Sequence, residues 1–265
     1  MNNIDNIKIE INDCNISLNK DVFNSDHFGI KMGNINIENF DVTISDIDLS
    51  RTFESLIEKA KEAKFKHLTF KIDTNNKQLV KCVEKKQFSL ADTLITYLFD
   101  FKKSILPEMN HKCILGDCKE EDIETLKEIS RTSFQIDRFH SDDSLDNYLC
   151  DTYYEKWIEN SFNGFADKVI VAYFNEVPVG YTTGKVYDNE KYGHLVLSAV
   201  SSESRGLGVY TSMIYEGVHW MKNEYANKVD GLLVGTQINN IAVQKAWIKL
   251  GFSVFDSQYV FQKLL

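Results

Sequence analysis

The spacing of hydrophobic and polar positions changes along the first half of the chain, and each spacing predicts an element. Apolar and polar residues alternate, as in half-buried strands, over four segments: residues 7–16, 35–44, 67–72 and 90–101. Apolar residues recur three and four positions apart over residues 49–63 and 77–86, which predicts amphipathic helices. The first half should therefore form an α/β unit.

The second half has a different order of patterns. Two helices are predicted over residues 120–134 and 148–160, and a hairpin follows, with strands 168–174 and 179–186 on either side of a polar turn. The remaining segments alternate between strand and helix patterns: strand 194–200, helix 209–222, strand 232–236, helix 240–250 and strand 252–265. The order αα-ββ-β-αβαβ predicts an α/β fold with a mixed sheet flanked by helices.

A polar break separates the two halves. One of only two prolines, Pro107, lies in the stretch 104–110 between two periodic regions. We therefore expect two domains, residues 1–106 and residues 112–265.

The chain also repeats itself at an offset of 164 residues. The segment 86–93 parallels 250–257, and the matched positions are Asn76 with Asn240, Phe88 with Phe252, Ser89 with Ser253, Asp92 with Asp256, and Thr93 with Ser257. Equal spacing within the same strand–helix–strand pattern favours an internal duplication. The first copy has no glycine loop like residues 205–208, so we expect it to be a scaffold or a wall of the substrate site.

Charge and composition exclude several classes of function. The net charge of −9 disfavours nucleic acid, and no stretch approaches the ~20 apolar residues of a membrane helix. The first five residues lack the features of a signal peptide, so we expect a cytoplasmic protein. Five scattered cysteines indicate neither disulfides nor a metal site. A monomer and a homodimer are equally compatible with the sequence.

One loop has the residues of a phosphate site. Arg205-Gly206-Leu207-Gly208 lies between a predicted strand and a predicted helix, so its amides and the first free amides of the helix converge. The glycines allow a close approach to an anion, and Arg205 adds a charged donor. A glycine pair alone is also common in ordinary strand-to-helix turns.

Taken together with the strand before this loop and the motif that follows its helix, the sequence resembles the GNAT superfamily of N-acetyltransferases over residues 112–265. The family's acetyl-CoA loop, Arg/Gln-x-x-Gly-x-Gly/Ala, matches Arg205 and Gly208, but Tyr210 replaces the last small residue. The later pattern Asn-x-x-Ala-x-x-x-Tyr-x-x-x-Gly-Phe is met by Asn240, Gly251 and Phe252, with Val243 in place of Ala. The resemblance implies a GNAT fold, a first half similar to a degenerate GNAT repeat, acetyl-CoA as cosubstrate, and no metal.

The resemblance also implies which residues hold acetyl-CoA. The pantetheine would pair with the strand residues Leu197, Ser198, Ala199 and Val200, and the amide near Ala199 or Val200 would stabilise the oxyanion. The pyrophosphate would bind the amides of Arg205, Gly206, Leu207, Gly208, Val209 and Tyr210. Asn240 and Trp247 would contact the cofactor from the other side.

The sequence defines the general acid and the general base of the implied acetyl transfer less well than the cofactor site. Trp247 stands where the family has its tyrosine acid, and an indole N–H donates a hydrogen bond but does not release a proton. Tyr210, Tyr215 and Tyr259 are possible substitutes. For the base we consider His194 and His140, because histidine titrates near neutral pH. Each histidine also fits a structural role.

A narrower resemblance is to the dTDP-fucosamine acetyltransferases, which acetylate the 4-amino group of a nucleotide-linked dideoxy sugar. It rests on residues 24–29, 137–142 and 154–161. It implies that Arg138, His140 and Trp157 bind substrate, although Trp157 at helical spacing also fits a core position. Two alternatives stay open: another amine acceptor, such as an amino acid, a polyamine or an aminoglycoside, and a non-catalytic protein that binds CoA or a partner.

Overall fold

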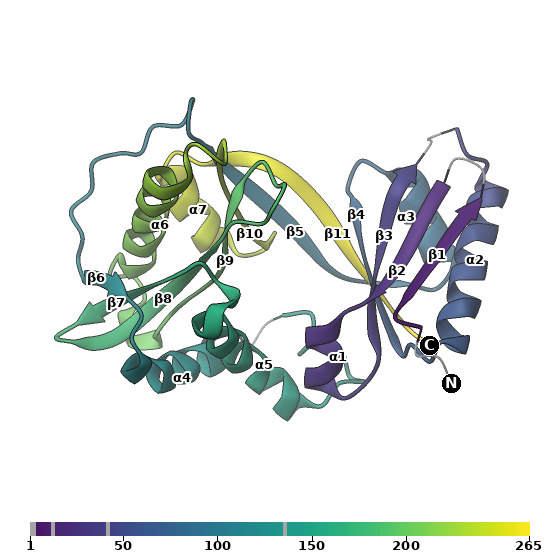
Figure 1. Cartoon of the computed structure of the whole chain (residues 1–265), viewed down its shortest axis with the longest axis horizontal. Helices are drawn as coiled ribbons and strands as arrows, with labels where there is room; N and C mark the ends of the chain where they lie inside the picture. Colours follow the sequence, from purple (N-terminus) through teal and green to yellow (C-terminus); the bar gives the residue numbers. More distant parts are fainter. Residues whose placement is uncertain (1–3, 12–13, 41–42, 135–136) are drawn as a thin grey trace. The chain divides into compact units, whose positions relative to one another are not determined.

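The computed structural model describes residues 4–11, 14–40, 43–134 and 137–265 (Figure 1). These residues form two compact units. The first unit contains residues 1–94 and 257–265, and the second contains residues 95–256. The described helices include none that is long and apolar enough to cross a membrane.

The first unit is built on strands β1 (Asn6–Ile11), β2 (Cys14–Lys20), β3 (Met32–Phe40), β4 (His67–Asp73) and the end of β11 (Ser253–Leu264), in that order across the sheet. β3 and β4 are parallel, and the other pairs are antiparallel. Helices α1 (Val22–Phe28), α2 (Asp46–Glu62) and α3 (Lys77–Lys85) complete the unit. The core centres on buried side chains of α2 such as Phe53 and Leu56.

The second unit orders its strands as β5, β10, β9, β8, β7, β6. Their bounds are β5 (Ser89–Asp100), β6 (Ile114–Asp117), β7 (Lys168–Phe174), β8 (Val177–Lys185), β9 (Gly193–Val200) and β10 (Gly231–Gln237). The helices are α4 (Ile123–Ser133), α5 (Asn147–Asn160), α6 (Val209–Tyr225) and α7 (Ile241–Lys249), with short turns η1 (Glu120–Asp122), η2 (Ser161–Phe165) and η3 (Ser202–Ser204).

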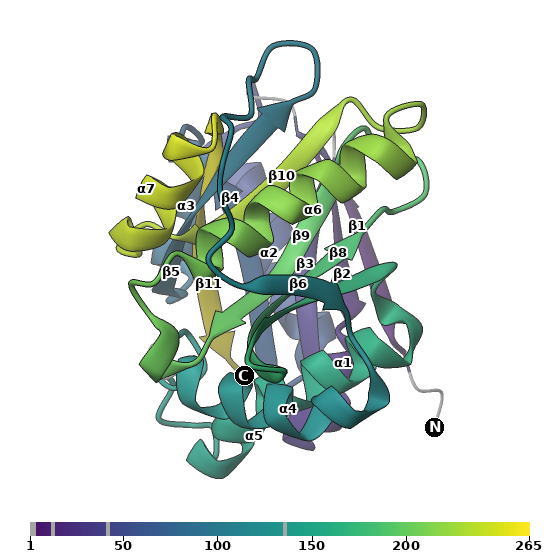
Figure 2. The ribbon, with the colours of Figure 1, turned by 90° about the vertical axis from the view of Figure 1, so that its left-hand side faces the viewer.

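Helices cover both faces of the second unit's sheet. Leu126 of α4 and Ile158 of α5 pack with Val171 and Leu197 on one face. On the other face α6 crosses β8, β9 and β10 (Figure 2). This approach is close because Gly184 faces Trp220, where an added Cβ would come within 2.1 Å of the indole ring.

The internal repeat appears in the element bounds. At the offset of 164 residues, β4 falls on β10, α3 on α7 and β5 on β11, each with identical first and last positions, and α2 falls within one residue of α6. The matched strands end in different units. β5 begins in the first unit and ends in the second, whereas β11 begins in the second and returns to the first.

This exchange of strands divides the chain elsewhere than the expected boundary near Pro107. Residues 95–106 lie in the second unit, and residues 257–265 lie in the first. In the first unit β11 occupies the place beside β4 that a strand following α3 would take, with Phe261 opposite Phe70. A break in sequence pattern marks where the chain is polar, and it carries no information about which sheet a strand joins.

Three element predictions were wrong. Residues 7–16 are not one strand but parts of β1 and β2. The apolar positions 7, 9 and 11 are followed by 14, 16 and 18, so the alternation changes phase across positions 12 and 13, which lie outside the described residues. Helix α1 was missed because its seven residues are too short for a helical period. Strand β6 was missed for the same reason, being four residues long. The second half therefore begins with a strand before its two helices.

Candidate functional site

The predicted phosphate loop joins β9 to α6 and is exposed. Gly206 and Gly208 have φ values of +79° and +82°, a region that residues with a Cβ rarely adopt. Gly208 is the N-cap of α6, and no side chain caps this helix. The first intrahelical bond runs from Ser212 N–H to the Gly208 carbonyl at 3.0 Å. The amides of residues 209–211 therefore have no acceptor within the helix, as an anion site requires.

Strand β9, which leads into this loop, contains a β-bulge. The pairing of β8 with β9 passes from Thr183 opposite Leu197 to Gly184 opposite Leu195, which leaves Val196 as an extra residue. Leu195 accordingly packs on the α6 side of the sheet and Leu197 on the α4 side. A bulge bends and twists its strand.

The two parallel strands separate at this bulge. β9 pairs with β10 only from Gly193 to Leu195, opposite residues 232–234. Beyond Leu195, β9 continues for five residues to Val200 without a partner on the β10 side. This divergence leaves backbone hydrogen-bonding groups of β9 without a strand partner on that side, within the part of the chain that the structure describes.

The direction of each amide along β9 follows from two hydrogen bonds. Leu197 N–H donates to the Thr183 hydroxyl at 3.1 Å, and Ser201 N–H donates to the Val179 carbonyl at 2.9 Å, so both point toward β8. By the alternation of a strand, the Ala199 N–H also points toward β8, whereas those of Ser198 and Val200 point toward the divergence. Of the two oxyanion donors expected from the sequence, the geometry favours Val200 over Ala199, and it adds Ser198.

Three further predicted residues lie around this divergence. Tyr210 packs against both hydrophobic clusters that meet there, one containing Leu195 and Trp247 and the other containing Val200. Trp247 is 2% exposed. Burial raises the pKa of the Tyr210 hydroxyl, and the nearby Trp247 N–H acts in the opposite direction. Asn240 begins α7 and donates from its side chain to the Thr236 hydroxyl at 3.0 Å.

A second basic residue near the loop was not anticipated. The Lys112 side chain comes within 3.8 Å of the position that a Cβ on Gly208 would occupy. Neither Lys112 nor Arg205 forms an ion pair with another described residue. Lys112 was not predictable from the sequence, because a lone lysine in a polar connection belongs to no motif. Both cations are thus available near the uncapped end of α6.

Two candidate catalytic residues lie away from the loop. His194 is at the start of β9, and its Nε2 is 2.6 Å from a Glu190 carboxylate oxygen. Six residues of extended strand, roughly 20 Å, separate it from Val200. Tyr259 belongs to the first unit, where it pairs with Ile72 and packs at the edge of the core.

The turn after α4 contains His140 in a ring of carboxylates. Its Nδ1 is 3.1 Å from an Asp137 oxygen, and its Nε2 is 3.1 Å from an Asp151 oxygen. Asp137 is 6% exposed and also accepts the N–H groups of residues 139 and 140. A His140 acting as base would first have to release one of these contacts.

The same turn is tied to the divergence through α4. The Ser133 hydroxyl donates to the Val200 carbonyl at 3.3 Å, so the chain leaves α4 at the loop end of β9. Arg138 lies over the Phe139 ring, 4.5 Å from its centroid. Trp157 is partly buried and stacks with Tyr154, which agrees with its interpretation as a core residue. The residues predicted to bind the acceptor therefore follow a helix that contacts β9, and they are already engaged within the protein.

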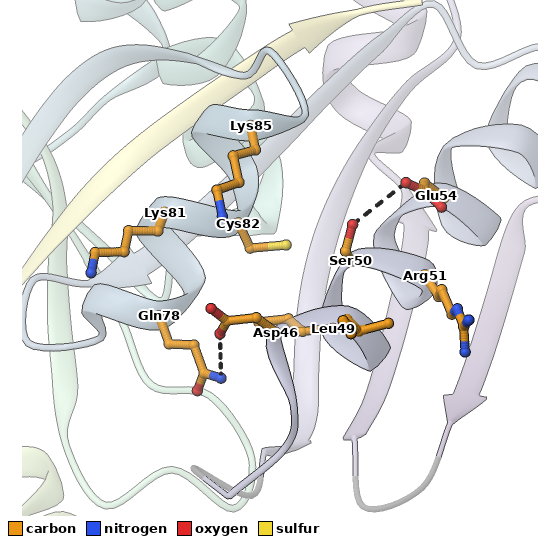
Figure 3. Close-up of a pocket in the computed structure, with 10 residues that line it drawn as sticks. Asp46, Leu49, Ser50, Arg51, Glu54, Gln78, Lys81, Cys82 and Lys85 are labelled. Atoms are coloured by element: carbon orange, nitrogen blue, oxygen red, sulfur yellow. Dashed lines mark hydrogen bonds between the residues drawn. The ribbon is translucent and has the colours of Figure 1, made fainter.

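A separate pocket of about 390 Å³ lies in the first unit between α2 and α3 (Figure 3). Asp46, which accepts a hydrogen bond from Gln78, lies near one end, and Glu54 lies near the other. Its charged lining residues are Asp46, Arg51 and Glu54 of α2 and Lys81 and Lys85 of α3. Among the described residues, no group of three or more His, Cys, Asp or Glu side chains is arranged to hold a metal ion.

Comparison with known families concerns the part of the chain that contains this site. Residues 123–252, which include β9, the loop, α6 and α7, match the model of the acetyltransferase (GNAT) family. This part of the chain is therefore similar to GNAT acetyltransferase domains. The spore coat polysaccharide biosynthesis protein SpsD of Bacillus subtilis is 26% identical over 147 residues, which are 56% of this chain and 49% of SpsD. The chain thus matches about half the length of that relative.

Solved structures share the fold of both units. A functionally unknown conserved protein from Staphylococcus epidermidis superimposes with a TM-score of 0.64 at 14% identity, covering 98% of this chain and 95% of that one. A tandem GNAT protein from the clavulanic acid biosynthesis pathway gives a TM-score of 0.63 at 14% identity, covering 95% and 78%. These similarities support the α/β GNAT fold and the duplicated architecture predicted from the sequence.

Proposed function

We propose that the protein is an acetyl-CoA-dependent N-acetyltransferase whose cofactor binds along β9 and at the N-terminus of α6. The observation that carries this proposal is the combination of a strand pair that separates at Leu195 with an uncapped helix at its open end. The amides of Ser198 and Val200 would bind the pantetheine and the acetyl carbonyl. The amides of residues 208–211, with Arg205 and Lys112, would bind the pyrophosphate.

The geometry supports direct attack by an amine on the bound thioester. Holding both substrates in one cleft removes much of the entropic barrier, and a preorganised amide donor on the developing oxyanion contributes ~3–4 kcal/mol. We propose Asn240 as a further contact for the cofactor, since its side chain does not cap α7. His194 and His140 remain candidates for the base. His140 lies in the turn after α4, where its two ring nitrogens contact the carboxylates of Asp137 and Asp151.

For the acceptor we propose an amino sugar, in particular a nucleotide-linked 4-amino-dideoxy sugar. The support is the resemblance of residues 137–142 to enzymes of that class and the match with SpsD, a polysaccharide biosynthesis protein. Arg138 would pair with the diphosphate after leaving Phe139.

The turn after α4, residues 137–142, also supports a second candidate for the acceptor, a cationic amine such as a polyamine or an aminoglycoside. The carboxylates of Asp137 and Asp151 contact the two ring nitrogens of His140, and acidic groups favour a cation over a diphosphate. The two candidate acceptors differ in their need for Arg138. A sugar nucleotide needs its positive charge to bind the diphosphate, whereas a cationic amine does not.

The test is the release of CoA thiol from acetyl-CoA, measured against a panel of nucleotide-linked amino sugars, free amino sugars, polyamines and amino acids. We expect one class to give turnover well above hydrolysis. An Arg138→Ala variant should lose turnover of a sugar nucleotide and keep turnover of a polyamine. Folded protein that binds acetyl-CoA but acetylates no amine would contradict the enzymatic proposal and favour a non-catalytic CoA-binding protein.

A further inference from the structure

The pocket between α2 and α3 of the first unit carries an excess of positive charge. Its lining includes Arg51, Lys81 and Lys85. Neither lysine forms an ion pair with another residue in the described part of the chain, and Arg51 has only a loose contact, at 3.9 Å, with the Asp48 carboxylate. The two lysines are four positions apart on α3, where like charges repel each other. An anion bound between the helices would relieve this repulsion.

The two acids in the lining do not neutralise these cations. Glu54 pairs with Lys86, and this contact holds the pKa of the Glu54 carboxyl below its usual range. Asp46 accepts a hydrogen bond from the Gln78 amide at 3.1 Å. The pocket therefore stays locally positive in a chain whose net charge is −9.

The matching helices of the second unit meet through apolar contacts instead. Three pocket-lining residues of α2 are polar: Asp46, Ser50 and Glu54. At the offset of 164 residues they fall on Tyr210, Ile214 and Val218 of α6, which pack in one hydrophobic cluster with Trp247 of α7. The first unit thus forgoes apolar burial along this seam and keeps an open, polar space. Binding of a polar ligand accounts for that exchange.

We propose that this pocket binds a hydroxylated phosphate monoester of about the size of a sugar phosphate. Its volume of about 390 Å³ is near the lower end of ligand pockets, ~300–1,000 Å³, and so fits a molecule smaller than acetyl-CoA. Lys85 directs its ammonium group into the space beside Cys82, whereas Lys81 and Arg51 extend outward at the rim (Figure 3). Exposed side chains of this length change rotamer within nanoseconds, so both can turn toward a doubly charged phosphate.

The remaining polar groups match the hydroxyl groups of such a ligand. The Asp46 carboxylate and the Gln78 amide meet near one end of the pocket, and Ser50 lies on the α2 wall (Figure 3). Carboxylates accept hydrogen bonds from hydroxyl groups, and amides and hydroxyls both donate and accept. Leu49 and Cys82 are buried and add apolar surface. Binding there is independent of the acetyl transfer proposed for the second unit.

Calorimetry on the full chain with glucose 6-phosphate, inorganic phosphate and succinate tests the proposal. Glucose 6-phosphate should bind tightest, because it combines a doubly charged phosphate with hydroxyl groups. Lys81→Gln/Lys85→Gln should weaken its binding about 100-fold, which is about tenfold for each charge-assisted hydrogen bond lost. The matched control is Lys245→Gln/Lys249→Gln, the same pair in α7, and it should bind glucose 6-phosphate as the wild type does.

A second variant separates the cavity from its charge. Ser50→Ile introduces the residue of the matching position, Ile214, and should fill the pocket beside Leu49. We expect it to lose glucose 6-phosphate binding while its Tm stays the same or rises, since the added side chain buries apolar surface. In the wild type, bound glucose 6-phosphate should slow amide hydrogen exchange over residues 44–54 and 77–86.

Several results would overturn the proposal. Binding of glucose 6-phosphate that is equal in the wild type and Lys81→Gln/Lys85→Gln would do so, as would equal losses in the two lysine pairs. Succinate that binds as tightly as glucose 6-phosphate, or no binding of any probe at millimolar concentration, would also contradict it. Displacement of glucose 6-phosphate by acetyl-CoA would assign the pocket to the cofactor and overturn a separate ligand.

Discussion

The two units carry the same helices after the same strands, yet the ends of these helices differ. In the first unit Ser45 caps α2 by accepting the Asp48 N–H at 3.0 Å, and Asp46 and Asp48 place negative charge in the first turn. In the second unit Gly208 begins α6 with no side-chain cap and no acid in the first turn. A capped, acidic helix end is satisfied internally, whereas an open one is available to an anion.

The second pair of helices differs in the same way. Asn76 caps α3 by accepting the Leu79 N–H at 3.0 Å. Asn240, at the matching position of the repeat, instead donates to Thr236 and does not cap α7. The same residue type therefore stabilises a helix in one unit and leaves the helix end free in the other. The repeat therefore contributes architecture in the first unit and the proposed acetyl-CoA site in the second.

The largest expected effect comes from making α6 resemble α2. Gly208→Asp places a carboxylate at the proposed phosphate site, and we expect acetyl-CoA affinity to fall by about 100-fold or more because like charges repel at short range. The positive φ adds about 1–2 kcal/mol of strain to the folded state. Isothermal titration calorimetry measures the affinity.

Gly29→Asp is the control for that strain. Gly29 has a φ of +67° and no atom within 4 Å of an added Cβ, and it lies in the first unit. Its stability loss should be similar and its acetyl-CoA affinity unchanged. Equal affinities for the Gly208→Asp variant and the wild type would remove the phosphate site from α6.

Removing one cation should have a smaller effect. Arg205→Ala deletes a charged donor beside the loop, and we expect about a tenfold loss of acetyl-CoA affinity, the value of a hydrogen bond to a charged group. Arg51→Ala, in α2 of the first unit, should leave the affinity unchanged. Salt titrations of both variants sharpen the comparison, because the Arg205 contribution should shrink as ionic strength rises. Equal losses in the two variants would mean that the effect is not local to the loop.

The matched asparagines should separate stability from binding. Asn76→Ala removes a cap and should lower the free energy of unfolding by about 1 kcal/mol without changing acetyl-CoA affinity. Asn240→Ala should change stability less and weaken acetyl-CoA binding by a few fold. Urea denaturation and calorimetry on both variants provide the readouts. The reverse assignment of effects would contradict the division of roles between the units.

The smallest effect concerns pH and the first unit's core. Burial raises the pKa of the Cys82 thiol from 9.0 to about 11. The unfolded chain loses this proton near pH 9 and the folded chain keeps it until about pH 11, so the free energy of unfolding falls as pH rises through this window. Cys82→Ala introduces the residue of the matching position, Ala246, and should make the fall shallower. Parallel pH profiles for the two proteins would contradict this origin.

Much of the second unit was predictable because its signals are local. The alternation in β8 and β9, the helical period of α6 and the glycines at 206 and 208 all specify structure within a few residues. The repeat also was visible, since identities such as Phe88 with Phe252 kept their spacing. These features sufficed for the fold and for the phosphate loop.

Other features depend on contacts that sequence spacing does not encode. The exchange of β5 and β11 between units, the bulge at Val196 and the approach of Lys112 to Gly208 arise from long-range pairing and packing.

The central claim is that acetyl-CoA binds the open end of α6 and not the capped end of α2. Amide hydrogen exchange in the presence and absence of saturating acetyl-CoA tests it most directly, since it reports on both helix ends in one sample. The account predicts slower exchange over residues 196–211 and no change over residues 44–52. Unchanged exchange over residues 205–211 in protein with bound acetyl-CoA, or equal protection at both helix ends, would contradict it.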